Sequence, residues 1–145
     1  MRSPEKLIES AAEFARSDSR IVAAALCGSY ARGTTRPDSD LDIALVSPDP
    51  NSLLNERDWL DTFGTPTGVG TEDYGLLQSI RVYYGTLEVE FGIAGLEWVE
   101  PPIDSGTAEV LRGPMRILHD PERLFDIAIA AVRRHSPGSG YNFRY

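Results

Sequence analysis

Apolar residues recur three and four positions apart in several stretches of the chain, which is the spacing of one helix face. The helices expected from this pattern cover residues 4–19, 51–64, 107–112 and 121–135. Ser3 and Pro4 supply an N-cap and a favourable first position for the first helix. Asn51 is expected to cap the second helix, Gly64 to end it, and Pro121 to open the last one.

Shorter apolar or alternating runs predict strands between these helices. The strands expected are residues 21–27, 41–46, 67–74, 76–84 and 86–94. The first run is continuously apolar and closed by Gly28, which is typical of a buried strand, although its alanines would also suit a helix. The stretch 67–74 is expected to be irregular, and the last two strands flank Gly85 as a hairpin.

The length, charge and cysteine content of the chain indicate what kind of protein it is. Its 145 residues suffice for one domain with a real core, and we expect a single domain over residues 1–135 and a flexible tail, 136–145. The formal net charge of −8 argues against a broad nucleic-acid groove, because a negative surface repels phosphate backbones. Cys27 is the only cysteine, which favours a reducing compartment. No run approaches membrane-spanning length, so a soluble, cytoplasmic protein is expected.

The segment Gly28-Ser29-Tyr30-Ala31-Arg32-Gly33 follows the first strand and has the chemistry of a phosphate site. Glycine lets the backbone approach a ligand closely and tolerates positive φ. If a short helix begins after Gly28, its free N–H groups and dipole favour a phosphate there. Ser29 Oγ can add a donor, and Arg32 can reach back towards the same anion. Taken alone, a glycine–serine pair after a strand would also suit a plain turn.

Asp40 and Asp42 stand two residues apart at the start of the next strand, so their side chains project from the same face. Two like charges at this spacing repel unless a cation or hydrogen-bond donors lie between them. Oxygen ligands of this kind suit Mg²⁺, which takes one or two carboxylates together with substrate phosphates. The alternative is an exposed strand start with two solvated aspartates.

A metal-assisted displacement calls for a third carboxylate, and the alternating strand 86–94 offers two. Glu88 and Glu90 share one face of this strand, with apolar residues on the other. We favour Glu90, which is flanked by Val89 and Phe91 and lies nearer the strand centre; Glu88 is the alternative. A solvated sheet face would also explain both glutamates.

Four other residues have weaker claims. Arg81 lies in the middle of a strand, where it could face the cleft or pair with a neighbouring glutamate across the sheet. Trp59 and Trp98 are expected in the core or at its rim rather than as a platform for a base. Tyr74 lies in the irregular stretch near the expected cleft and receives no role.

The run Gly-Ser-x-Ala-Arg-Gly, followed by Ser-Asp-x-Asp and a later acid on a strand, resembles the DNA polymerase beta-type nucleotidyltransferases. It is most similar to small bacterial stand-alone domains, such as the minimal nucleotidyltransferases and the core of antibiotic adenylyltransferases. The specific match covers residues 28–42, and the order of elements extends it loosely over residues 5–135.

This resemblance implies an α/β (α+β) fold, a mixed sheet with helices packed mainly on one face. It also implies Mg²⁺ and the transfer of a nucleoside monophosphate, with ATP as the expected donor, to an acceptor hydroxyl. By matching position, Gly28 and Ser29 would hold the triphosphate, with Arg32 beside them, while Asp40 and Asp42 would hold the metal. Glu90 would complete the metal site or act as the base. A glutamate here departs from the aspartate of polymerase-like members and is similar to the antibiotic-modifying branch.

The acceptor is expected to be a small molecule or a partner protein. Antibiotic-modifying relatives carry an extra helical region that shapes the acceptor pocket, and this chain has little length for one. A partner or a homodimer would then select the acceptor, for example in a toxin–antitoxin pair that adenylylates a HEPN-type RNase. The alternative is a non-catalytic nucleotide-binding module, acting as an antitoxin or a sensor through protein–protein binding. Retention of Asp40, Asp42 and a later acid argues against a complete loss of catalysis.

Overall fold

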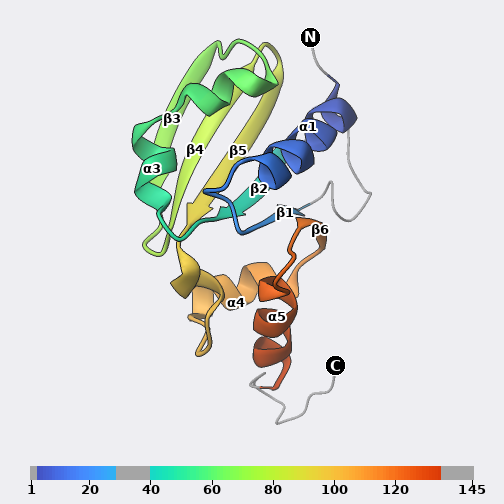
Figure 1. The fold of residues 1–145 in the computed structure, drawn as a ribbon, viewed down its shortest axis with the longest axis vertical. Helices are drawn as coiled ribbons and strands as arrows, with labels where there is room; N and C mark the ends of the chain where they lie inside the picture. The colour runs from blue at the N-terminus through green and yellow to red at the C-terminus, as the bar shows by residue number, and fades with distance from the viewer. Residues whose placement is uncertain (1–2, 29–39, 135–145) are drawn as a thin grey trace.

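The fold is built on one mixed sheet, seen in a computed structural model that describes residues 3–28 and 40–134. Six strands lie in the order β3-β4-β5-β2-β1-β6, with β2 and β5 parallel and the other neighbours antiparallel (Figure 1). The elements in chain order are α1 Pro4–Ser17, β1 Ala23–Cys27, β2 Leu41–Val46, α3 Pro50–Asn55, the 3₁₀ helix η1 Asp58–Phe63, β3 Gly68–Asp73, β4 Leu77–Tyr84, β5 Leu87–Ala94, the 3₁₀ helix η2 Leu96–Val99, α4 Ser105–Arg112, β6 Met115–His119 and α5 Leu124–Arg134. The α+β class and the mixed sheet are therefore confirmed.

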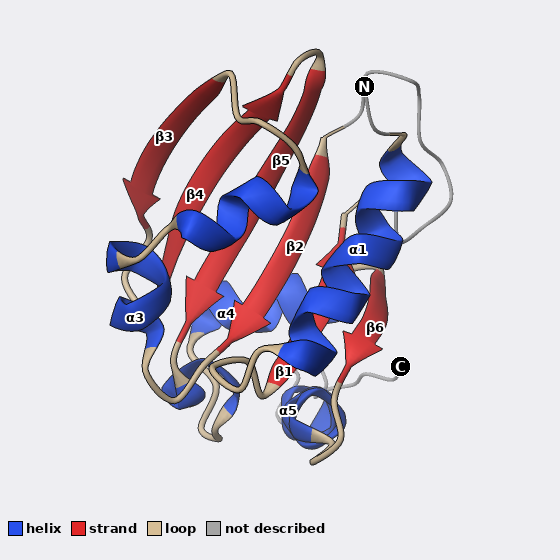
Figure 2. Ribbon diagram, turned by 45° about the horizontal axis from the view of Figure 1, so that its top comes forward, coloured by secondary structure: helices blue, strands red, loops and turns tan. Residues whose placement is uncertain are grey.

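The first face of the sheet is covered by α1, α3 and η1. Alternate strand residues such as Ile43 and Phe91 point into this core and are almost fully buried. Trp59 of η1 joins them, with its ring 5.1 Å from that of Phe91 and 5.4 Å from that of Phe14. The prediction of Trp59 as a core residue is confirmed. Figure 2 shows α1 in front of the sheet and α4 behind it.

The second face of the sheet is covered in part by η2, α4 and α5. Here the strands contribute small residues, among them Ala25 and Ala44, and the helices contribute Trp98 and Phe125. Small side chains let a helix approach the sheet closely, because little volume separates the two backbones. The charged side chains described below lie on this same face, beyond the part that the helices cover.

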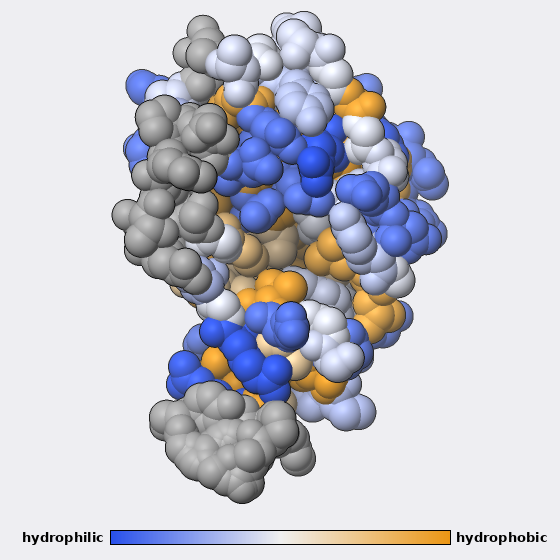
Figure 3. Space-filling model, turned by 180° about the vertical axis from the view of Figure 1, so that it is seen from behind, coloured by the Kyte–Doolittle hydropathy of each residue, from blue (hydrophilic) through white to orange (hydrophobic). Residues whose placement is uncertain are grey.

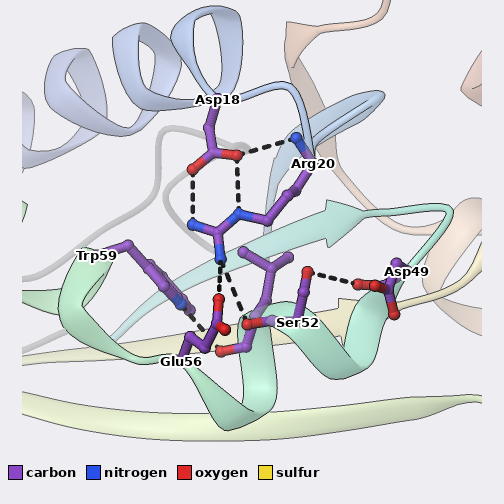
Figure 4. Close-up of polar contacts among 7 residues, drawn as sticks. Asp18, Arg20, Asp49, Ser52, Glu56 and Trp59 are labelled. Carbon is purple, nitrogen blue, oxygen red and sulfur yellow. Dashed lines mark hydrogen bonds and ion pairs between the residues drawn. The ribbon is translucent and has the colours of Figure 1, made fainter.

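A polar bridge fixes α3 against the start of β1 (Figure 4). The Asp18 carboxylate accepts hydrogen bonds from Arg20 Nε and Nη2 at 2.9 and 2.7 Å. Arg20 Nη1 donates to the Ser52 carbonyl at 3.3 Å, and Trp59 Nε1 donates to the Leu53 carbonyl at 3.0 Å. The Ser52 carbonyl also accepts from the Glu56 N–H at 3.1 Å, so Arg20 adds a second bond there and ties α3 to the segment before β1.

Several boundaries differ from the sequence prediction. The single helix expected over 51–64 is wrong: α3 ends at Asn55 and η1 begins at Asp58. Arg57 Nε donates to the Leu54 carbonyl at 2.6 Å and so closes α3, and Asp49 rather than Asn51 occupies the N-cap position. The tighter turn of η1 then places Trp59, Leu60 and Phe63 in the core.

Three further differences concern the last helix and two strands. The last helix begins at Leu124 rather than Pro121, because the Asp120 carboxylate accepts from the N–H groups of Leu124 and Phe125 at 2.8 and 2.9 Å. Residues 115–119 form the edge strand β6, and 68–73 form a regular strand β3. The buried strand before Gly28, the hairpin and the Ser3 cap are confirmed. None of the helices within residues 3–28 and 40–134 is long and apolar enough to cross a lipid bilayer.

Candidate active site

One row of residues across four neighbouring strands forms the centre of the candidate site. Cys27 pairs with Asp42, Asp42 with Glu90, and Glu90 with Arg81, so the four side chains project from the same face. The parallel pairing of β2 and β5 brings together two acids that are far apart in the sequence. It places Glu90, rather than Glu88, directly opposite Asp42.

Asp42 is partly buried, and its surroundings oppose its negative charge. Burial, followed by the charge of Glu90 and a hydrogen bond with Glu90, raises the pKa of Asp42 to about 6. The charge of Asp40 acts in the same direction, and Arg81 acts against it. Asp40 itself is exposed at the start of β2. A positive charge between these carboxylates would relieve the repulsion.

Glu90 is held by two residues of β4. Ser79 Oγ donates to Glu90 Oε2 at 2.6 Å, and Arg81 Nη2 lies 3.5 Å from Glu90 Oε1. Arg81 Nη1 also lies 3.0 Å from Glu88 Oε2, so the guanidinium is a cross-strand partner of both glutamates. The sequence analysis missed Ser79. The alternation of β4 was the signal for it, since Ser79 lies two residues before Arg81 on the same face.

Gly28 follows Cys27 directly, at the β1 end of this row. Its φ is +78°, in the left-handed region that favours glycine. A Cβ built at this position would lie only 2.8 Å from Asp42 Oδ2, so the backbone here approaches the acid more closely than a side chain would allow. Ser29 and Arg32, the other residues expected at the phosphate, lie outside the described residues.

The acids fit a divalent cation by their chemistry, although they do not form a full ligand cage. Within residues 3–28 and 40–134, no three His, Cys, Asp or Glu side chains are grouped closely enough to hold a metal ion. Asp42 and Glu90 offer carboxylate oxygens side by side, and their mutual repulsion is what a divalent ion would offset. Mg²⁺ commonly takes only one or two carboxylates and completes its shell with water and substrate phosphates.

A cavity of about 460 Å³ adjoins the acids on this face. Its lining combines the acid pair with mostly apolar residues from β4, β5, η2 and α4: Cys27, Gly28, Asp42, Ile43, Ala44, Tyr74, Leu77, Ser79, Glu90, Gly92, Trp98, Glu109, Val110, Gly113 and Pro114. Figure 3 shows this face hollowed near its centre, between a hydrophilic band and a hydrophobic floor. Burial and the nearby Asp42 raise the pKa of Cys27 to about 12, so its thiol stays protonated at neutral pH.

The sequence analysis gave no role to most of this lining. Tyr74 is 58% exposed at the rim of the cavity, and Trp98, expected in the core or at its rim, is 3% exposed and forms part of the wall. The residues of α4 come from the other end of the chain. Their contribution depends on how the helix packs on the sheet, and no local pattern reports that.

A mixed sheet with paired acids beside a glycine turn is an arrangement suited to metal-assisted transfer at a phosphate. Comparison with known families agrees: the nucleotidyltransferase domain family matches residues 8–98, more than half of the chain. The chain therefore belongs to the nucleotidyltransferase domain family. No curated protein matches the chain.

A solved structure supports the fold. The chain is similar to the crystal structure of an aminoglycoside 6-adenyltransferase from Bacillus subtilis, with a TM-score of 0.55 and 18% sequence identity. The match covers 68% of this chain and 37% of that protein, so the chain corresponds to little more than a third of its length. At this identity the likeness concerns the fold.

Proposed function

We propose that the chain transfers AMP from ATP to a hydroxyl group of a small molecule or a partner protein, with Mg²⁺ as cofactor. The observation that carries this proposal is the direct pairing of Asp42 with Glu90 beside the Gly28 turn. A cation between two carboxylates at this spacing would offset their repulsion, and a close backbone turn beside them suits the phosphates that accompany the cation.

Each residue has a part in this proposal. Gly28, Ser29 and Arg32 hold the triphosphate, and Asp40, Asp42 and Glu90 hold Mg²⁺. When bound, Mg²⁺ offsets the charge of the phosphates and makes an acceptor hydroxyl easier to deprotonate. Selection of the acceptor by a partner protein, by a toxin in particular, or by a second copy of the chain stays a prediction.

Glu90 is also the group best placed to take the proton of the acceptor hydroxyl. Ser79 and Arg81 fix its carboxylate on the face where the cavity lies. A base that is already oriented loses little freedom on reaction, which favours proton transfer. Glu88 is not assigned this role, because it pairs with Arg81 and does not lie opposite Asp42.

The test uses ATP labelled at either the α- or the γ-phosphate, with Mg²⁺ and with small-molecule and protein fractions of a cell extract as acceptors. We expect the α label on an acceptor together with released pyrophosphate. Asp42→Asn and Glu90→Gln should each lower the rate at least about 100-fold, because each removes a charge that the reaction uses. Glu9→Gln is the matched control, an exposed glutamate on α1 at the opposite face.

Other results would redirect the proposal. Transfer of the γ label would indicate a phosphoryl transferase, and full activity of Asp42→Asn would contradict the assigned acid. Binding of ATP with Mg²⁺ but no transfer to any acceptor would favour the alternative, a non-catalytic module that acts through protein–protein binding.

A further inference from the structure

The cavity beside the acids exists because a row of small residues lies next to the charged row. Ala44 of β2 pairs with Gly92 of β5, and Gly92 pairs with Ser79 of β4. None of these side chains rises far from the sheet. The Leu77 side chain packs over Gly92, and Trp98 is also part of the lining. The cavity of about 460 Å³ is large enough for a ring-sized group.

The lining of this cavity changes character away from the acids. Beyond Asp42, Glu90 and Ser79, its walls are mostly apolar, with Leu77 from the sheet and Val110 from α4. The other polar side chains of the lining are those of Tyr74 and Glu109. In the part of the chain that the structure describes, no lysine or arginine lines it. Such walls leave most of the extra hydroxyls of a sugar-like acceptor without partners, and their carboxylates repel an anionic group.

The order of the strands says from which side an acceptor would approach. Gly28, the proposed phosphate turn, is on β1, while Glu90 is on β5 and Ser79 on β4, with β2 between them. In a displacement at phosphorus, the attacking and leaving oxygens lie roughly in line. The cavity spans these strands, from Gly28 at the β1 end to Ser79 at the β4 end. With the leaving pyrophosphate at the β1 end, the attacking hydroxyl comes from the β4 and β5 end.

We infer that the β4 and β5 end of this cavity is the acceptor subsite and that it selects a hydroxyl carried on a mostly apolar body without negative charge. The inference rests on the proposed function. The acceptor oxygen forms a bond to the α-phosphorus, the bond from that phosphorus to the α,β-bridging oxygen breaks, the hydroxyl proton passes to Glu90, and pyrophosphate leaves. A free alcohol and a protein side chain can present the same chemistry.

The test measures binding and transfer separately. The Trp59→Phe variant leaves Trp98, a wall of the cavity, as the only indole, so its fluorescence reports binding without nucleotide or metal. The probes are 2-phenylethanol, which represents a free alcohol, and N-acetyl-tyrosinamide, which represents a protein side chain. The emission of the tyrosinamide phenol is subtracted. Erythritol is the polar control. We expect at least one apolar probe to bind and to accept AMP, and erythritol to do neither.

Two matched variants locate the binding. Val110→Glu puts a charge into the cavity at a residue that is 39% exposed, and we expect it to weaken apolar binding and transfer about tenfold or more. Ile127→Glu makes the same change at a residue of α5 that is 51% exposed and does not line the cavity, and it should have no effect.

Three results would overturn the inference: equal binding by Val110→Glu and the parent, preferred transfer to erythritol, or displacement of the apolar probe by adenosine. The last would assign the cavity to the base of the nucleotide. Transfer to erythritol alone would refute the acceptor subsite and leave the proposed function intact. Binding of the probe without transfer to any acceptor, in the probe panel or in cell extract, would refute both.

Discussion

The negative charge of Asp42 destabilises the folded protein when no metal is bound, and a single substitution tests this. Its pKa is about 6 in the folded state, against 3.8 in an unperturbed carboxyl, so the folded protein binds more protons between these values. Stability therefore falls as the pH rises through this window and stays reduced above it. Asp42→Asn should raise the free energy of unfolding by about 1 to 3 kcal/mol at pH 8 in EDTA.

Urea unfolding at a series of pH values checks this. The gain from Asp42→Asn should shrink as the pH falls below 6 and vanish only well below 3.8, where the wild-type carboxyl is protonated in both states. Adding Mg²⁺ at pH 8 should stabilise the wild type more than the variant. A variant that is less stable at every pH would show that Asp42 supports the fold and would count against its role as a ligand.

At this scale, the acids were recognisable from the sequence, Arg81 was one of two alternatives as their partner, and Ser79 was missed. The two-residue spacing of Asp40 and Asp42 and the alternation of β5 are local patterns, so the sequence could point to them. The choice between Glu88 and Glu90 depends on the register of β2 against β5, which brings Glu90 opposite Asp42. A shift of two residues would have left Glu88 there, with the same faces buried.

At the scale of elements, helix α4 links a capping interaction to the wall of the cavity. The Asp104 carboxylate accepts from Thr107 N at 3.1 Å and also from the Thr107 hydroxyl. Asp104→Ala should therefore lower the free energy of unfolding by about 1 kcal/mol. Because α4 carries Val110, the same change should weaken binding of an apolar probe in the cavity, as measured by the fluorescence of Trp98.

Ser3→Ala is the control for this prediction. Ser3 caps α1 by accepting from Lys6 N at 3.3 Å, but α1 packs on the opposite face of the sheet. Its loss should reduce stability by a similar amount and leave the cavity unaffected. If both variants weaken binding equally, the effect follows general destabilisation rather than the position of α4.

Element boundaries were predictable where capping and apolar spacing agreed. Ser3 and Pro4 start α1 as expected, and Gly85 lies between the two strands of the hairpin. The break between α3 and η1 was not visible, because it depends on the bond from Arg57 to the Leu54 carbonyl and on the packing of η1 in the core. Strand β6 is a short edge strand whose apolar alternation is weak, and it is ordered by its pairing with β1.

At the scale of the whole molecule, one sheet separates two apolar cores. Strands β1 and β2 serve both, since Ala24 and Ile43 face the first core while Ala25 and Ala44 face the second. Loss of either core would expose one side of these central strands. The single domain expected over residues 1–135 follows as a prediction about cooperativity, because neither core can keep its strands when the other unfolds.

The two tryptophans report the two cores, which makes this prediction measurable. Trp59 is buried with Phe91 in the first core, and Trp98 packs on Phe125 in the second, with ring centroids 6.3 Å apart. Trp59→Phe and Trp98→Phe each leave one indole. Each variant has its own stability, so within each one the fluorescence transition in urea is compared with the transition followed by far-ultraviolet circular dichroism. We expect the two curves to coincide in both variants, with equal slopes. Earlier loss of the Trp98 signal would show that η2, α4 and α5 unfold as a separate unit on a sheet that survives without them.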